Sequence, residues 1–382
     1  MPDPFPFHPE EASRSRWGRV TQPFRALRQT GRSYRHFLLP ALNGAFGDQL
    51  AAGHDPRAIR LSFRRHDADV TTLDLHLTDG PRPTVVFVHG LMGDEHIWQT
   101  GPAGLLRYGP RLAQDLPVRC LYVRYNTGLH ISENGRALSQ LLTQLVQAWP
   151  EAITDLTLVG HSMGGLVIRS AGYYAQAAGG ISQENPAGPE ASPGQIKAGR
   201  LAAQTTDPAS PSLADLTVSS APWLTHLRQV FLLGVPNEGS FLEQHSFLTA
   251  LALRRFDLRL ARLLADTIDR RSHGIRDLRH ARLVDEDWQN PHADDLLPPR
   301  TKVPPLPGVR YHVLAASLLK NAESALAQYF GDGLVGRGSA TGSVFRRSEQ
   351  VQVRIFPRQH HGTLLADADV YEYLRAQLTA PV

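Results

Sequence analysis

Short, unbroken apolar runs recur along this chain, and they constrain its fold more than any other feature. Thr84-Val-Val-Phe-Val88 is typical of them, and such a run indicates a strand buried on both faces. Further candidate strands are Cys120–Val123, Leu156–Val159, Val230–Leu233, Tyr311–Leu314 and Val351–Phe356. Helical stretches such as Arg136–Trp149 and Leu166–Ala177 separate most of them. This alternation predicts an α/β fold, with a mostly parallel central sheet flanked by helices.

Two segments before these runs have a different pattern. Ile59–Phe63 and Leu73–Leu77 alternate between apolar and polar residues with a period of two. Such alternation predicts half-buried, antiparallel strands. We therefore expect an antiparallel pair at the beginning of the sheet.

Residue composition changes along the chain and divides it into segments. We expect residues 57–382 to form one domain, preceded by a basic helical arm at 1–56. Residues 178–215 are rich in Gly, Pro, Ser and Ala, which predicts a flexible surface insertion. Apolar residues at helical spacing predict a helical insertion at 241–300. This insertion forms either a lid over a site or additional core, and the sequence leaves both open.

The arm combines arginines with aromatic residues. Its side chains include Arg14, Arg16, Arg19, Arg25, Arg28, Arg32, Arg35, Trp17, Phe24, Tyr34 and Phe37. A basic amphipathic segment of this kind can contact an anionic membrane surface. Alternatively, the arm packs on the domain through its aromatic residues, and this interpretation is preferred.

Charge and cysteine content narrow the classes of function. The net charge is +4 over 382 residues, which gives no general argument for nucleic-acid binding. A single cysteine, Cys120, excludes an internal disulfide framework and fits a reducing compartment. We find neither a secretory signal nor an apolar run long enough to span a membrane. We therefore expect a cytoplasmic protein, with peripheral membrane contact left open, and the oligomeric state stays undetermined.

One apolar run leads into a serine flanked by glycines. Gly160-His-Ser162-Met-Gly164 matches the pattern G-x-S-x-G, between a predicted strand and a predicted helix. A tight turn there exposes the serine oxygen above the sheet, and side chains at the glycine positions would clash in such a turn. The N-terminus of the following helix favours developing negative charge. Ser162 is therefore the candidate nucleophile.

A nucleophilic serine needs hydrogen-bond donors for the oxygen that becomes negative. The backbone N–H of Met163 directly follows Ser162 and is one candidate donor. The run ending at Val88 leads into His89-Gly-Leu-Met-Gly93, where Gly90 allows close approach of the backbone. We predict that the N–H of Leu91 is the second donor of an oxyanion hole.

The motifs HGLMG, GHSMGG and Gly331-Asp-Gly-Leu-Val335, followed by a late histidine, resemble the α/β-hydrolase superfamily. Within it, the chain is similar to bacterial lipase-like serine esterases and to hydrolases that resemble GPI inositol-deacylase. The resemblance covers roughly residues 57–382 and implies the chain order Ser, Asp or Glu, His. It implies that Asp332 is the acid that orients the histidine.

The base is either His360 or His361, after the last predicted strand. In the superfamily a pair of apolar residues commonly follows the catalytic histidine after a short gap. Leu364-Leu365 stands at that distance from His361, so the resemblance favours His361 over His360.

The sequence predicts no cofactor and no metal site. The pattern G-x-G-x-x-G occurs at Gly331–Gly336, but a helical stretch precedes it instead of the strand that a dinucleotide site requires. No H-E-x-x-H or paired-cysteine motif occurs.

These observations predict a serine hydrolase that cleaves carboxylic esters through Ser162, Asp332 and His361, by an acyl-enzyme. The expected partner is a small-molecule or lipid ester, without nucleic acid. An acyltransferase or an amidase with the same three residues, and a catalytically silent binding protein on this fold, remain alternatives.

Overall fold

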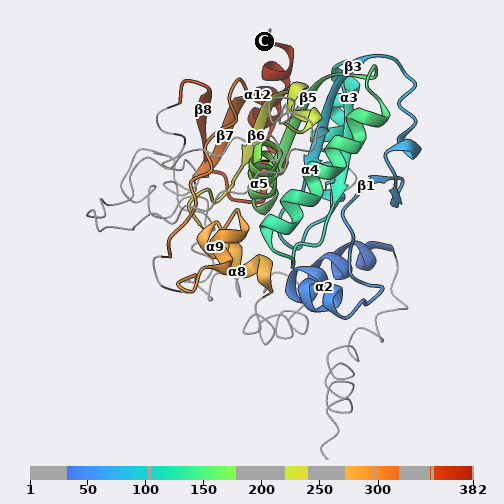
Figure 1. Cartoon of the computed structure of the whole chain (residues 1–382). Helices are drawn as coiled ribbons and strands as arrows, with labels where there is room; N and C mark the ends of the chain where they lie inside the picture. The colour runs from blue at the N-terminus through green and yellow to red at the C-terminus, as the bar shows by residue number, and fades with distance from the viewer. Residues whose placement is uncertain are drawn as a thin grey trace, which may run out of the picture.

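The computed structural model describes residues 32–101, 105–177, 220–239, 272–293, 295, 298–317, 345 and 348–380. A twisted central sheet runs through the molecule, and helices cover both of its faces (Figure 1). This arrangement confirms the predicted α/β fold with a mostly parallel sheet.

The sheet has the strand order β2-β1-β4-β3-β5-β6-β7-β8. From β4 to β8 all neighbouring strands are parallel, whereas β1 is antiparallel to both β2 and β4. The strands are β1 Ser62–Arg65, β2 Ala68–Val70, β3 Arg82–Val88, β4 Arg119–Arg124, β5 Ile153–His161, β6 Leu227–Leu233, β7 Arg310–Ser317 and β8 Val351–Pro357. The six strands predicted from Thr84–Val88 to Val351–Phe356 are therefore confirmed as β3 to β8.

Each face of the sheet has its own apolar core, because successive side chains of a strand point to opposite faces. One core contains Val86 and Val88 of β3 and packs against α4 Ile131–Ala148 and α5 Met163–Ala177. The other contains Val85 and Phe87 and packs against α3 Tyr108–Asp115 and α12 Ala368–Thr379. Burial on both faces explains the unbroken apolar run of β3.

The predicted strand Leu73–Leu77 is wrong. Leu73–Leu75 forms the short 3-10 helix η2, and Ala68–Val70 pairs with β1 instead. The Thr71 hydroxyl donates to Asp74 Oδ2 at 2.6 Å, and the Asp74 N–H donates back to Thr71 Oγ1 at 3.3 Å. Such local bonds favour a turn over a strand. Leu75 and Leu77 are still buried. The alternation of apolar and polar residues in this segment therefore reflects which side chains are buried, and not an extended backbone.

Helix α2 Arg32–Ala52 lies in the segment predicted as an arm. It contributes Leu42, Ala45, Phe46 and Leu50 to a small apolar cluster of its own. The side chain of Asn43 is fully buried; it donates to Arg57 O at 2.9 Å and accepts from the Ile59 N–H at 2.8 Å. These bonds fix the chain between α2 and β1.

Several predicted segments fall outside the described residues. The insertion at 178–215 and the arm before residue 32 lie wholly outside them. Of the region 241–300, the structure describes α8 His273–His280, α9 Asp285–Gln289 and the chain around them. In the described part of the chain, no helix is long and apolar enough to cross a bilayer. The remaining short helices are η3 Glu95–Trp98, η5 Pro222–Thr225 and η8 Thr363–Leu365.

Candidate active site

The parallel strands end together at one edge of the sheet. Val88 of β3 is in register with Gly160 of β5, and His161 is in register with Leu233 of β6. The chain passes from β3 outward to β4 and then returns to β5 on the other side of β3. Such a reversal of strand order opens a crevice at the carboxyl ends, where ligands bind in open α/β sheets. The loops after β3 and β5 therefore flank a candidate binding site.

Ser162 connects β5 directly to α5 in a left-handed backbone conformation, with φ of +52°. A non-glycine residue in this region costs about 1–3 kcal/mol unless its surroundings enforce it. Here the Ser162 N–H donates to Leu233 O at 2.9 Å, and Ser162 O accepts from the Gly165 N–H at 3.0 Å. Both backbone groups are held, so the strand and the helix together impose the turn.

Gly164 allows α5 to begin in contact with the end of β3. A Cβ added there would lie 2.4 Å from both Val88 O and His89 O. Both are backbone atoms, so no change of side-chain rotamer could make room. The second glycine of the G-x-S-x-G pattern, Gly164, is thus required because the helix lies so close to the neighbouring strand.

The loop after β3 lies beside the serine. A Cβ added to Gly90 would lie 3.1 Å from Ser162 Cβ, so the glycine lets the loop backbone approach the nucleophile. The Gly93 N–H donates to Gly90 O at 3.2 Å, and Met92 has φ of +56°, as in a type II turn. The Met92 N–H donates to Thr127 Oγ1 at 3.2 Å.

The predicted oxyanion donors lie at this junction. Among the described residues, none accepts a hydrogen bond from the Leu91 N–H, although its neighbours Met92 and Gly93 both have acceptors. Met163 is the first residue of α5, where backbone N–H groups have no partner within the helix. Leu91 and Met163 are therefore close to Ser162 in the chain or in space, and their role as oxyanion donors stays a prediction.

His89 fixes the base of this loop. Its ring is fully buried, stacks on Tyr125 at 4.4 Å between ring centroids, and accepts from the Tyr125 N–H through Nε2 at 3.3 Å. Its Nδ1 lies 2.9 Å from Gly90 O and donates to it in the tautomer that this contact requires. Burial lowers the pKa of His89, which keeps the ring neutral. The ring therefore acts as a fixed hydrogen-bonding support.

Of the two candidate bases, His361 lies next to the nucleophile turn. Its ring centroid is 4.6 Å from that of His161, and its carbonyl lies 3.2 Å from His161 Nε2. Gly234 directly follows Leu233, whose carbonyl accepts the Ser162 N–H. A Cβ added to Gly234 would lie 3.1 Å from His361 Nδ1. The structure therefore brings His361 and Ser162 to the same end of the sheet.

His360 is placed differently. It is exposed, and its backbone N–H donates to Thr363 Oγ1 at 2.8 Å in the turn before η8. Leu364 and Leu365, the apolar pair that favoured His361, are both buried in the core beside α12. Burial of this pair anchors the histidine loop.

Asp332 lies outside the described residues, so its part in the site stays a prediction. Sequence analysis did not single out His161 and Trp98. His161 lies between Trp98 and His361, with its ring centroid 6.4 Å from the indole of Trp98. The position of His161 directly before Ser162 was the only available signal for its proximity to the site.

Comparisons with known proteins bear on this site. The family described as "Putative serine esterase (DUF676)" matches residues 81–190, a range that contains β3, the Leu91 loop, Ser162 and α5. This match supports an ester hydrolase. No curated protein matches the chain.

Solved structures of bacterial hydrolases are also similar. Lipase BlEst2 from Bacillus licheniformis is 17% identical over 79% of this chain and 95% of its own, with a TM-score of 0.44. Carboxylesterase CesB from Bacillus subtilis is 11% identical over 90% of this chain and 99% of its own, with a TM-score of 0.39. An alpha/beta hydrolase fold protein from Chitinophaga pinensis is 11% identical over 79% and 91%, with a TM-score of 0.39. Scores at this level do not assign a shared substrate.

The contact at Gly164 gives a test of the turn. We predict that Gly164→Ala lowers the free energy of unfolding by about 1–3 kcal/mol or more, because the new Cβ overlaps backbone atoms of β3. Urea denaturation measures this change. Gly362→Ala is the control, because its Cβ would meet its nearest atom at 3.7 Å. Equal stability of both variants would contradict the packing described here.

Proposed function

We propose that this chain hydrolyses carboxylic esters with Ser162 as its nucleophile, a proposal supported by the serine esterase family match and by the fold. The observation that carries the proposal is the position of Ser162. It stands at a positive φ between β5 and α5, with the Gly90 backbone close to its side chain. A serine hydroxyl becomes an effective nucleophile only beside a base and beside donors for the oxyanion.

In the proposed reaction His361 takes the proton of Ser162 Oγ as this oxygen attacks the ester carbonyl carbon. The carbonyl oxygen becomes negative and accepts hydrogen bonds from the N–H groups of Leu91 and Met163. His361 then gives its proton to the leaving alcohol, and an acyl-enzyme remains. Water then attacks the acyl-enzyme carbonyl as His361 takes its proton, and the acid leaves as Ser162 Oγ regains a proton from His361. Asp332, assigned by the sequence pattern alone, orients the imidazole of His361.

The proposed substrate is a small-molecule or lipid ester. The family match points to an ester as the bond cleaved. The same three residues could also transfer the acyl group to an alcohol or act on an amide, and product analysis with added acceptor alcohols separates transfer from hydrolysis.

We predict that Ser162→Ala lowers turnover of p-nitrophenyl esters by at least about 10³-fold, because the covalent step is lost. His361→Ala should have an effect of similar size, because residues of one catalytic unit are not additive. His360→Ala is the matched control and should retain activity. A series of acyl chain lengths, assayed with all four proteins, measures this. Unchanged turnover in Ser162→Ala would exclude the proposal.

The oxyanion donor can be removed without a change in the turn. Leu91 occupies the second position of the Gly90–Gly93 turn, a place that favours proline in type II turns. We predict that Leu91→Pro, which lacks the N–H, lowers kcat by about 10²–10³-fold with little change in thermal stability. Leu91→Ala keeps the N–H and is the control. If both variants lose activity equally, the side chain rather than the N–H matters.

A further inference from the structure

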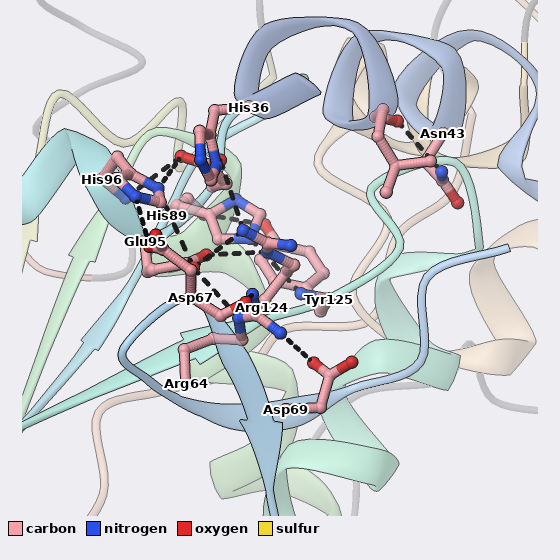
Figure 2. A network of polar contacts seen from close by, with 12 residues as sticks. His36, Asn43, Arg64, Asp67, Asp69, His89, Glu95, His96, Arg124 and Tyr125 are labelled. Atoms are coloured by element: carbon pink, nitrogen blue, oxygen red, sulfur yellow. Dashed lines mark hydrogen bonds and ion pairs between the residues drawn. The ribbon is translucent and has the colours of Figure 1, made fainter. Parts of the chain in front are cut away.

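A second polar cluster lies behind the oxyanion loop. Figure 2 shows that His36 of α2 points toward His96 of η3, and that Asp67, from the turn between β1 and β2, lies beneath them. Asp94 caps η3 by accepting from the His96 N–H at 3.0 Å. Three segments that are distant in the sequence therefore bring imidazole and carboxylate groups to one place.

The distances within the cluster suit a small cation. Ligand atoms of His36, Asp94 and His96 all lie within 4.8 Å of one another. His96 Nδ1 is 3.3 Å from Asp94 Oδ1, and His36 Nδ1 is 3.7 Å from Asp94 Oδ2. Ligand atoms around a tetrahedral zinc ion, with bonds near 2.0–2.1 Å, lie about 3.4 Å apart. Only small side-chain movements would be needed to close such a site.

The hydrogen bond on the far side of His96 orients its ring. His96 Nε2 donates to Asp67 Oδ1 at 2.9 Å, which leaves the lone pair of the neutral ring on Nδ1. This Nδ1 is buried and makes no hydrogen bond among the described residues, yet it faces a carboxylate oxygen of Asp94. A lone pair and a carboxylate oxygen repel each other, so this approach requires either a proton or a metal cation between them. Metal-bound histidines characteristically donate their other N–H to a carboxylate in this manner.

The charges around the cluster leave room for a divalent cation. Glu95 is buried and paired with two arginines: its oxygens accept from Arg64 Nε at 2.9 Å and from Arg124 Nε at 2.7 Å. Asp69 accepts from Arg64 at 2.6 Å. Four carboxylates thus face two guanidinium groups, which leaves an excess of two negative charges before the imidazoles are counted. The charged groups are Asp67, Asp69, Asp94, Glu95, Arg64 and Arg124.

We propose that His36, Asp94 and His96 bind a zinc ion, with Asp67 orienting His96. Two imidazole nitrogens and one carboxylate oxygen are ligands that zinc prefers. The His36 and His96 side chains are 27% and 26% exposed, which gives an ion and a water ligand access. The sequence predicted no metal site, because these ligands form no contiguous motif and come from different elements.

The ion would stabilise the loop that carries the proposed oxyanion donor. Asp94 directly follows Gly93, the last residue of the turn that contains Leu91. A zinc ion held by Asp94 and His96 and also by His36 of α2 would join this loop to the N-terminal helix. The role proposed is therefore structural, and its test does not depend on ester hydrolysis.

Zinc content and affinity test the proposal in the full chain, freed of any tag and dialysed against a chelator. After zinc chloride is added and the excess is removed by gel filtration, we expect one zinc ion per chain by elemental analysis and a higher thermal midpoint than in the zinc-free protein. The variant His36→Ala/His96→Ala should lose both. Asp67→Asn keeps all three ligands and should weaken zinc affinity by about 10–100-fold in competition with a chromogenic chelator. His292→Ala, which alters a histidine with a 72% exposed side chain after α9, should match the wild type.

Several outcomes would overturn the proposal. One is a wild type without bound zinc at micromolar zinc concentration, in which case a proton alone bridges His96 and Asp94. Another is zinc affinity that is unchanged in Asp67→Asn, a variant with little effect on the ligands themselves. Zinc retained by the double variant would place the ion elsewhere. Stabilisation by calcium or magnesium but not zinc would contradict the ligand chemistry.

Discussion

The close approach of α5 to the ends of β3 and β5 is the constraint on which the rest of the site depends. Space between the helix and the backbone of β3 is so limited that only glycine fits at position 164. The same approach holds Ser162 at a positive φ, with its N–H bonded to Leu233 O of β6. It also places the N-terminus of α5, with its unpaired N–H groups, directly under the serine. The packing of the helix against the strands thus fixes both the backbone turn at Ser162 and the position of the Met163 N–H beside it.

The loop after β3, which carries Leu91, is held in place by contacts with neighbouring residues. His89 and Tyr125 hold its beginning, and Thr127 holds Met92. Its continuation carries buried Glu95, whose charge is compensated by two arginines of neighbouring strands. Removing one partner of such a buried pair typically costs about 3–5 kcal/mol, so the network fixes the loop firmly. The proposed zinc ion would extend this support to α2.

Much of the fold and part of the site follow from local patterns. Local patterns predicted β3 to β8: the apolar run of β3 is unbroken because both faces of the strand are buried, whereas β8 lies at the edge of the sheet and contains exposed residues. The alternating segment at Leu73 failed, because the bonds between Thr71 and Asp74 favour a turn that still buries Leu75. The proximity of His361 to the Ser162 turn agrees with the sequence motifs, whereas the catalytic roles of the two residues stay predictions. The cluster of His36, Asp94 and His96 was not predictable, since it exists only once α2 has packed on the loop after β3.

Labelling with a fluorophosphonate tests the central claim most directly, since this reagent reacts with a serine only when a neighbouring base activates it. The intact chain and the His361→Ala and His360→Ala variants would be labelled in parallel, and the modified peptide identified by mass spectrometry. The account predicts one adduct, on Ser162, in the wild type and in His360→Ala, and its loss in His361→Ala. Absence of labelling in the wild type, or an adduct on another serine, would contradict it.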